Sequence, residues 1–510
     1  MNKISTFFST LFKRSLDIVE KTGNALPHPA TLFGILALLV AIASAIGYYF
    51  GLKAVHPTNG TIVTVTNLLS GDGLRWMYTS LYKNFVEFPP LGIVLTAMIG
   101  IGLAEGTGLL TTLIKAVVIT APKRLITATI VFAGVLSHTA SEAGYVILIP
   151  LAAIVFLALG RHPLAGLAAA FAGVSGGFGA NFIIGSIDPV LAGLSQSAAQ
   201  IIDPTMHLNP AINFYFMFVS GIVIVFAGTW VTEKIVEPRL GKYNGSAEAI
   251  SIDTISAVEK KGLRWAGISV LVASVIFIII TVPEYALLRN PETNSILKSP
   301  FLEGMITAVM IFFFLPGLVY GLVVKSIRND KEAIKHIIST MSGMAGYIVL
   351  VFFAAQFVYF FKQSNLGVIL AINGAEFLKS VGLTGIFLII GFVFLSAFIN
   401  MFMGSASAKW AIMAPVFVPM FMLLGYHPAL TQAAFRIGDS VTNLITPMMS
   451  YFALIVSFAQ KYNDKYGMGT IISMMLPYTF IFTLMWILLL VVWIVLGLPL
   501  GPDGALYYSK

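Results

Sequence analysis

Two residues of opposite charge, Arg436 and Asp439, stand in an otherwise apolar part of the chain. In a helix, a spacing of three residues places them on one face, where the guanidinium and the carboxylate can pair. Charge inside a hydrophobic segment is costly and marks functional sites in membrane proteins. Arg436 is therefore a candidate for binding a substrate carboxylate, since a guanidinium binds carboxylates through two parallel hydrogen bonds. The alternative is a purely structural pair with Asp439.

The stretch around this pair, residues 395–451, consists of short apolar segments broken by Gly, Ser, Asn and Pro. Interrupted segments of this kind are how membrane transporters expose backbone groups to ions and substrates. Residues 173–189 have the same character, with many glycines and with Asn181 and Asp188 near the break. Asp188 and Asp439 are candidates for carrying a proton or binding Na⁺. The alternatives are close helix packing for the glycines and, for Asp188, a helix end near the outer surface.

The composition restricts the chain to membrane proteins. Of its 510 residues, 58% are hydrophobic and only 10% are charged, against about 25% charged residues in a typical soluble domain. The net charge of +8 comes from Lys and Arg in short loops beside apolar segments, which is the positive-inside pattern and gives no indication of nucleic-acid binding. The sequence has no Cys, which excludes disulfides, thiolate metal sites and cysteine nucleophiles.

Apolar segments long enough to cross a bilayer, about 20 residues each, determine the expected architecture. They lie at 30–50, 88–112, 163–185, 211–231, 263–283, 301–325, 343–361, 428–452 and 471–498. Two further apolar stretches, 125–160 and 384–425, are each interrupted midway by polar residues. We interpret these two as re-entrant helical hairpins, and the alternative is two full spans joined by a short loop.

The basic residues predict which loops lie inside. With the basic N-terminus in the cytoplasm, every strongly basic loop falls on the same side of the membrane. The predicted organisation is a cytoplasmic segment (1–29), a first membrane half (30–231) with hairpin 125–160 and broken helix 163–185, a cytoplasmic linker (232–262), a second membrane half (263–500) with hairpin 384–425 and broken helix 428–452, and a C-terminal tail outside (501–510).

The two hairpin regions carry an internal repeat. The pairs Tyr145 and Trp410, Pro150 and Pro415, Gly160 and Gly425, His162 and His427, Pro163 and Pro428, and Gly173 and Gly438 are all separated by 265 positions. By the topology above, the first copy enters from inside and the second from outside, which is the inverted repeat of alternating-access transporters. The predicted fold is therefore an all-α polytopic membrane protein with about nine transmembrane helices plus two re-entrant hairpins in an inverted repeat. The two histidines precede prolines in turns and are interpreted as structural.

Several motifs together resemble one family. They are G-R-H-P-L-A-G-L (160–167), A-G-V-S-G-G-F-G-A-N (172–181), A-P-V-F-V-P-M-F-M-L-L-G-Y-H-P (414–428), F-R-I-G-D-S (435–440), N-A-L-P-H-P (24–29) and I-V-E-P-R-L-G (235–241). Nearly the whole chain resembles the p-aminobenzoyl-glutamate transporter (AbgT) family. The resemblance implies a homodimer in the bacterial inner membrane, with nine spans and two opposed hairpins in each chain. It also implies uptake of p-aminobenzoyl-glutamate, or export of sulfonamide antimetabolites as in some members, with Na⁺ or H⁺ as the coupling ion.

The resemblance further implies a set of substrate-binding positions. They are Asp188, Asn400, Trp410, Pro428, Arg436, Asp439, Asn443 and Pro447. Lys409 departs from the neutral residue expected in the second hairpin. One interpretation is that Lys409 favours a more acidic ligand, and the other is that its ammonium group extends to the outer surface. Trp410 is a candidate for stacking on an aromatic ring, with a plain membrane-interface aromatic as the alternative.

Symmetry between the two copies predicts cation sites at the hairpin tips. The expected ligands are Ser137, Ser141 and Asn181 in one copy, and Ser405, Ser407 and Asn443 in the other. Hydroxyl, amide and freed carbonyl oxygens suit a hard cation such as Na⁺, and the alternative is tight packing of small polar residues. Glu142, on the first tip, is a further candidate for titration, whereas Glu105 is expected at the inner surface. We expect no organic cofactor and no metal beyond the coupling ion.

These observations favour a secondary active transporter over other classes. We expect it to move p-aminobenzoyl-glutamate or a similar small anionic aromatic conjugate with Na⁺ or H⁺ by alternating access, and the alternative is a proton-coupled exporter of sulfonamide-type drugs. The sequence has no Walker A motif, so ATP-driven transport is not expected. An intramembrane hydrolase would need a nucleophile and a base, and the nearest approach to one is His138 beside Ser137 and Ser141. We therefore expect no enzyme activity, and the inverted repeat disfavours an ion channel.

Overall fold

The computed structural model describes residues 27–55, 60–140, 144–243, 255–296, 299–447, 449 and 451–508, of which 139 and 140 by their backbone alone. The described chain is almost entirely helical, apart from two short antiparallel strands, β1 (Lys53–Val55) and β2 (Ile62–Thr64). Eight of the described helices are long and apolar enough to cross a membrane, or up to ten if each of two sharply bent helix pairs counts as one span. The predicted fold class, an all-α polytopic membrane protein, is confirmed.

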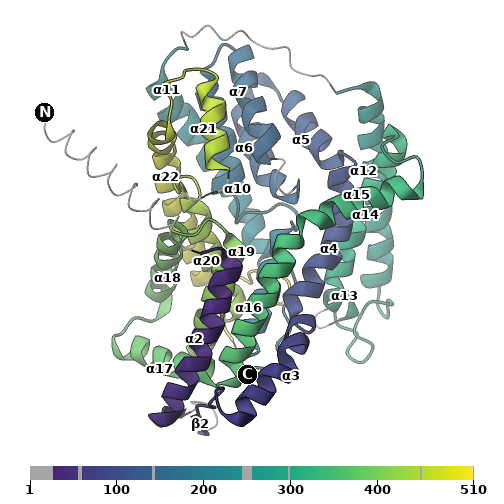
Figure 1. The fold of residues 1–510 in the computed structure, drawn as a ribbon. Helices are drawn as coiled ribbons and strands as arrows, with labels where there is room; N and C mark the ends of the chain where they lie inside the picture. Colours follow the sequence, from purple (N-terminus) through teal and green to yellow (C-terminus); the bar gives the residue numbers. More distant parts are fainter. Residues whose placement is uncertain are drawn as a thin grey trace, which may run out of the picture.

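The helices follow the chain in two runs (Figure 1). The first run comprises α2 (Pro29–Tyr49), α3 (Gly71–Val86), α4 (Pro89–Gly106), α5 (Leu109–Ile119), α6 (Ile126–Leu136), α7 (Ile149–Ala158), α8 (Pro163–Phe171), α9 (Ile187–Ala199), α10 (Phe214–Val231) and α11 (Glu237–Leu240). The second comprises α12 (Ala257–Thr281), α13 (Pro300–Glu303), α14 (Met305–Val324), α15 (Asp330–Gly343), α16 (Ala345–Gln363), α17 (Leu366–Ser380), α18 (Gly385–Asn400), α19 (Ala406–Leu423), α20 (Pro428–Thr442), α21 (Phe452–Gln460) and α22 (Met468–Val495). Short 3₁₀ and π-helical turns interrupt or extend the first run at η1 (Lys123–Leu125), η2 (Ser137–Ala140), η3 (Gly144–Leu148), η4 (Ala172–Gly176) and η5 (Thr232–Val236).

Five helices lie mostly where the sequence predicted connections: α3, α5, α9, α15 and α17. The helices α3 and α15 contain several charged residues, so a search for continuous apolar segments passes over them. The region predicted as a linker, 232–262, begins as a helical continuation of α10 through η5 and α11 and ends within α12. The predicted span 428–452 is divided, because α20 ends at Thr442 and α21 begins at Phe452.

The internal repeat appears in the helix boundaries themselves. The ends of α7 and α19, the starts of α8 and α20, and the starts of α9 and α21 are each separated by the same 265 positions. The arms of the first hairpin, α6 and α7, have 11 and 10 residues, and those of the second, α18 and α19, have 16 and 18. The arms of the first hairpin are therefore about half the length of a full span.

The two copies point in opposite directions. In Figure 1, α5, α6 and α7 occupy the upper part of the molecule, and α17 and α18 occupy the lower part. Each copy begins with a sharp bend, of 110° after α5 and of 120° between α17 and α18. The predicted inverted repeat is thus a feature of the fold.

The turns that join hairpin to broken helix have the same construction in both copies. Gly160 and Gly425 have φ of 73° and 89°, in the left-handed region that ends many helices and favours glycine. The following His162 and His427 cap the next helix, because Nδ1 of each accepts a backbone N–H two residues on at 3.2 Å. Burial lowers the pKa of His427 to about 4, so its ring stays neutral and Nδ1 remains an acceptor. The structural role predicted for the two histidines is a helix cap.

Different segments hold these two junctions in place. At the first, the guanidinium of Arg161 forms two parallel hydrogen bonds with the Glu237 carboxylate, at 2.8 and 2.5 Å. At the second, the C-terminal segment adds two backbone hydrogen bonds of 3.0 and 2.9 Å, from His427 N to Leu506 O and from Tyr508 N to Gly425 O. One junction therefore depends on an ion pair and the other on neutral backbone groups.

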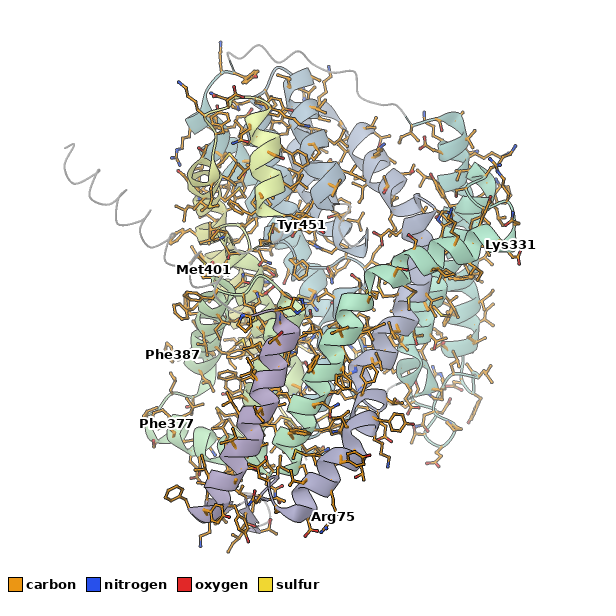
Figure 2. All side chains as sticks on the ribbon, in the orientation of Figure 1. Arg75, Lys331, Phe377, Phe387, Met401 and Tyr451 are labelled. Carbon is orange, nitrogen blue, oxygen red and sulfur yellow. The ribbon has the colours of Figure 1, made fainter. Side chains whose placement is uncertain are left out.

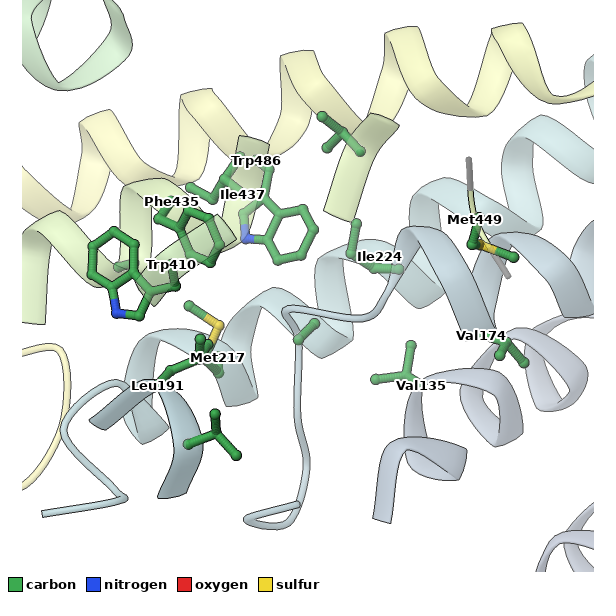
Figure 3. Close-up of a cluster of buried hydrophobic side chains, with 14 of the residues drawn as sticks. Val135, Val174, Leu191, Met217, Ile224, Trp410, Phe435, Ile437, Met449 and Trp486 are labelled. Carbon is green, nitrogen blue, oxygen red and sulfur yellow. The ribbon is translucent and has the colours of Figure 1, made fainter. Parts of the chain in front are cut away.

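The surface and the core are both apolar, as expected for a protein surrounded by lipid. Figure 2 shows Phe377 and Phe387 projecting from one edge of the molecule, and both side chains are exposed. In the interior, Figure 3 shows the indole of Trp410 beside the ring of Phe435, with centroids 4.5 Å apart. Because the surface and the core are both apolar, the burial of apolar side chains does not by itself indicate where the functional site lies.

Glycines at equivalent positions let the broken helices approach the hairpin arms. A Cβ added to Gly173 would lie 2.5 Å from the carbonyl oxygen of Val131 in α6, and one added to Gly438 would lie 2.3 Å from that of Val393 in α18. Both distances are shorter than any real Cβ contact. The close approach explains why the repeat retains glycine at this pair of positions.

We predict that Gly438→Ala destabilises the fold, because the new methyl group overlaps the backbone of α18, and overpacking of this kind costs about 1–3 kcal/mol. Gly391→Ala is the matched control on α18, where the space around the position is open. The control should be neutral or slightly stabilising, since alanine favours a helix over glycine by about 1 kcal/mol. Thermal unfolding of the detergent-solubilised proteins measures the difference, and equal melting temperatures would contradict the close approach of α18 and α20.

Candidate functional site

The broken helix α20 carries a buried polar stripe. Gln432, Arg436, Asp439 and Asn443 follow one another at intervals of four, three and four residues, which places them on one helical face. All four side chains are buried inside the protein. Polar and charged groups in a membrane protein face the bundle interior and pair there with other groups. The partners of this stripe must therefore come from the helices that pack against α20.

Arg436 reaches across to the first copy of the repeat. Its Nη1 lies 2.5 Å from Oδ1 of Asp188, in the first turn of α9, and its Nε donates to the carbonyl of Gly179 at 3.2 Å. The other carboxylate oxygen of Asp188 accepts from Asn181 Nδ2 at 2.6 Å and from Gly185 N at 2.7 Å. The N-terminal end of α9 also favours a negative charge through the helix dipole. Arg436 is thus held by the irregular segment that follows η4.

Two polar atoms of this cluster have no hydrogen-bond partner within the part of the chain that the structure describes: Nη2 of Arg436 and Oδ1 of Asn181. Both side chains are buried. Roughly 90% or more of the buried polar groups in native structures have a partner. One donor and one acceptor in the same cluster are therefore available to a further partner.

Asp439 pairs with Lys409 of α19. The Lys409 ammonium group contacts a carboxylate oxygen of Asp439 and the side-chain oxygen of Asn400, at the end of α18. Asn400 also donates to Asn443 Oδ1 at 2.8 Å, and Asn443 Nδ2 lies 3.5 Å from the second oxygen of Asp439. Lys409 is one of the largest fully buried side chains, and a charge so far from water needs a counter-charge. This second ion pair joins α18, α19 and α20.

Two interpretations of the sequence are wrong. Arg436 and Asp439 do not pair with each other among the ion pairs of the described residues. Each pairs instead with a group of opposite charge on a neighbouring helix. Lys409 does not extend to the outer surface but is buried against Asp439. Asp188 does lie at a helix end, in the first turn of α9, and its side chain is buried.

The other predicted substrate positions lie on the same elements. Trp410 follows Lys409 on α19, and its indole N–H donates to Ser195 Oγ of α9 at 2.9 Å. Pro428 is the first residue of α20, about 12 Å along the helix from Arg436. Pro447 follows the end of that helix. The predicted set therefore divides into two charged clusters, one aromatic residue and two prolines at the limits of α20.

The predicted cation ligands that the structure describes make hydrogen bonds within the protein. Ser137 Oγ donates to Gly134 O at 2.6 Å. Ser405 caps α19, and its hydroxyl lies 3.3 Å from that of Ser407. Asn181 and Asn443 belong to the two ion-pair clusters, Glu105 lies in the last turn of α4, and Ser141 and Glu142 lie outside the described residues.

Sequence reasoning missed two residues of the site, Ser195 and Gln432. Ser195 Oγ accepts the hydrogen bond from Trp410 and donates to Gln432 Oε1 at 2.6 Å. Neither residue is charged, so neither stands out in an apolar segment. The four-residue interval between Gln432 and Arg436 was the signal available, because it places both on one helical face.

A cavity of about 850 Å³ borders α9 and the start of α20. Its lining includes Gln196 of α9 and His427 at the cap of α20, together with the acidic residues Asp203, Glu303 and Asp503. Gln196 is adjacent to Ser195, and His427 precedes Gln432 by five residues. The cavity therefore touches α9 and the N-terminal cap of α20, and its lining includes no residue of the two ion pairs.

Residues 14–508 match the model of the AbgT putative transporter family. The chain belongs to this family. It is 41% identical, over 484 residues and 95% of each chain, to the p-aminobenzoyl-glutamate transport protein of Escherichia coli strain K12. The resemblance noted in the sequence motifs is thereby confirmed.

Two solved structures of transporters have the same fold. The Alcanivorax borkumensis YdaH transporter, whose topology is described as unusual, superimposes with a TM-score of 0.90 at 44% identity, covering 93% of this chain and 100% of its own. Neisseria gonorrhoeae MtrF, described as illuminating a class of antimetabolite efflux pumps, superimposes with a TM-score of 0.91 at 50% identity, covering 96% of this chain and 99% of its own. This AbgT-family chain is a multi-span membrane transporter.

The buried pair of Lys409 and Asp439 gives a stability prediction. Asp439→Asn should destabilise the protein by about 3–5 kcal/mol, because the ammonium group is left buried without a counter-charge. Changing both residues, to Met and Asn respectively, should recover most of this loss, because neither charge remains. Denaturant unfolding in detergent micelles measures both effects.

Asp72→Asn is the matched control, because it breaks an ion pair between two exposed side chains, Arg75 and Asp72, and such pairs contribute at most about 1 kcal/mol. If the Asp439→Asn protein is as stable as this control, the ion pair between Lys409 and Asp439 is not the buried contact described here.

Proposed function

We propose that this AbgT-family chain is a secondary active transporter for p-aminobenzoyl-glutamate or a similar small anionic conjugate of an aromatic acid with an amino acid. The observation that carries the proposal is the unpaired Nη2 of Arg436, a guanidinium donor held where the two copies of the repeat meet. In transporters built from inverted repeats, the substrate site lies at that interface. The name of the Escherichia coli relative and its 41% identity support the substrate class.

In the proposed complex, a substrate carboxylate accepts a hydrogen bond from Nη2 of Arg436. Asn181 Oδ1, the unpaired acceptor of the cluster, accepts an N–H of the substrate. Asp188 keeps the guanidinium in place through Nη1 and balances its charge while the site is empty. The two ion pairs are neutral together, so a bound carboxylate adds a negative charge, which favours the simultaneous binding of a cation. This charge balance couples substrate to ion.

The proposed position of the coupling ion is Asp439. Na⁺ would find a carboxylate and the amide oxygens of Asn400 and Asn443, which are suitable ligands for a hard cation. A proton would neutralise the carboxylate directly. Either ion weakens the attraction between Asp439 and Lys409, which joins α20 to α19. Binding of the ion thereby changes how firmly α20 is held.

The packing of α20 supports alternating access. This helix packs against α18 and α19 of its own copy and against α9 and η4 of the other copy. Movement of one copy relative to the other therefore changes which side of the membrane reaches the polar stripe. Substrate and ion bind to the stripe from one side and leave it to the other.

A proton-coupled exporter of sulfonamide-type drugs is the second candidate. The observation that favours it is the 50% identity and common fold with MtrF, which is described among antimetabolite efflux pumps. A coupled cycle runs in either direction, and the gradients of ion and substrate determine which one prevails. The two candidates therefore differ in substrate and direction but share the same moving parts.

Contacts between basic loops support a placement in the inner membrane with the N-terminus inside. Arg239 Nη2 donates to Ser473 Oγ at 2.8 Å, and Tyr243 OH donates to Tyr462 O at 3.3 Å, so the basic regions around 234–242 and 461–465 lie on one face. The positive-inside rule makes this face cytoplasmic. The C-terminal segment contacts the junction at Gly425, on the side proposed to be outside. The family resemblance supports a homodimer and transport without chemical change of the substrate.

Uptake of radiolabelled p-aminobenzoyl-glutamate into proteoliposomes, with Na⁺ and pH gradients imposed separately, tests the proposal. The wild type should accumulate intact substrate under one of the gradients. Arg436→Ala should reduce uptake at least tenfold, because a hydrogen bond to a charged group contributes about 1.5–3 kcal/mol. The double variant Lys409→Met with Asp439→Asn should equilibrate substrate without accumulating it, since residue 439 no longer responds to a cation.

Arg75→Ala, at an exposed arginine, is the control, and size-exclusion profiles establish that each variant is folded. Unchanged uptake by Arg436→Ala would remove the assignment of the substrate site. Transport of a labelled sulfonamide but not of p-aminobenzoyl-glutamate would place the second candidate first, and a cleaved substrate inside the vesicles would indicate an enzyme.

A further inference from the structure

A chain of hydrogen bonds crosses from α19 through α9 to α20. The indole N–H of Trp410 donates to Ser195 Oγ at 2.9 Å, and Ser195 Oγ donates to Gln432 Oε1 at 2.6 Å. All three side chains are fully buried. In this chain the Ser195 hydroxyl accepts from the indole and donates its one proton onward, so Gln432 presents its carbonyl oxygen to Ser195. The amide group of Gln432 is therefore left for another partner.

That amide group has no such partner in the described chain: Gln432 Nε2 is buried and makes no hydrogen bond there. Roughly 90% or more of the buried polar groups in native structures are paired. An apolar residue such as Leu or Met at position 432 would leave no donor unpaired. Arg436, four residues on, also has an unpaired donor, Nη2. Side chains at this spacing lie about 6 Å apart on one face. Two unpaired donors side by side are suited to a ligand with two separate oxygen acceptors.

The cavity of about 850 Å³ lies nearer to Gln432 than to Arg436 along α20. His427 lines the cavity and precedes Gln432 by five residues, about 7.5 Å along α20. Arg436 lies one further turn into the protein. Gln196, which also lines the cavity, is adjacent to Ser195, so the cavity meets both helices that hold the chain. Along α20, the amide donor is therefore nearer to the cavity than the guanidinium is.

We propose that Gln432 is a specificity-determining residue. Its Nε2 donates a hydrogen bond to a neutral oxygen on the atom that is bonded to the substrate's aryl ring. The inference rests on the proposed function and deepens it. In p-aminobenzoyl-glutamate this oxygen is the amide carbonyl, and in a sulfonamide it is a sulfonyl oxygen. The amide N–H of Gln432 can donate to either oxygen, since each is a neutral acceptor. Each oxygen is carried by the atom that is bonded to the aminophenyl ring. Arg436 then distinguishes the two classes, because only the conjugate has carboxylates.

p-Aminobenzoyl-glutamate and its thioamide analogue test this proposal. The two compounds have the same charge and nearly the same shape, but sulfur is a much poorer hydrogen-bond acceptor than oxygen. Competition with radiolabelled substrate for uptake into proteoliposomes gives an inhibition constant for each. The wild type is expected to prefer the oxygen compound about twofold to tenfold, which is the net effect of one neutral hydrogen bond.

Gln432→Met, which keeps the length of the side chain but has no donor, is expected to lose this preference. Gln432→Leu is a second variant for the case that the Met protein does not fold, because it is also apolar and has no hydrogen-bond donor. It has the same expected ratio near one. Thr431→Val is the matched control, because Thr431 is equally buried and its hydroxyl also lacks a hydrogen-bond partner among the described residues. The control should keep the wild-type ratio.

If Gln432 has only a structural role, its variants should bind both compounds more weakly by the same factor. The ratio of the two inhibition constants would then stay at the wild-type value, and this result overturns the proposal. A wild type without any preference overturns it as well, as does a Thr431→Val protein that loses the preference to the same degree. Failure of the wild type to take up either compound refutes the proposed function itself. The two failures are therefore distinguishable within one experiment.

Discussion

Charges inside a membrane protein need counter-charges, because neither lipid nor the packed interior supplies water. The helix α20 contributes Arg436 and Asp439, and its neighbours contribute Asp188 from α9 and Lys409 from α19. The requirement for neutrality thus ties α20 to both copies of the repeat at once. A displacement of α20 against either neighbour separates opposite charges, so such a movement becomes accessible when another ion or a charged substrate takes the place of a partner.

The irregular backbone around α8 and α20 serves the same requirement. After η4 the chain is no longer helical, which makes Gly179 O available to the guanidinium of Arg436 and Gly185 N available to the carboxylate of Asp188. Backbone groups outside a helix are tolerated at membrane depth only where the protein satisfies them. Here the charged side chains do so, and the backbone in turn orients the charges.

The helical architecture, the inverted repeat and most residues of the candidate site could be predicted from the sequence, because long apolar segments, a constant offset and rare charges are visible without a structure. The partners of the charges could not. Arg436 is three residues from Asp439 and 248 from Asp188, and only the packing of α9 against α20 makes the distant carboxylate the nearer one. Lys409 and Gln432 were misjudged or missed for the same reason, since burial against a particular neighbour leaves no mark in the local sequence. The mixed polar helices α3 and α15 were missed because their pattern resembles that of loops.

The two hairpin junctions are alike in geometry and different in chemistry. A partly exposed ion pair such as that of Arg161 with Glu237 weakens as salt screens it, over a distance of about 8 Å at physiological ionic strength. Hydrogen bonds between neutral backbone groups, which hold the junction at Gly425, are not screened in this way. In the proposed orientation the neutral junction faces the periplasm, whose salt content follows that of the surroundings, and the charged junction faces the cytoplasm, whose ionic strength the cell regulates. The geometric symmetry of the two halves therefore coexists with a difference in sensitivity to salt, and the proposed orientation puts the less sensitive junction on the side where salt varies more.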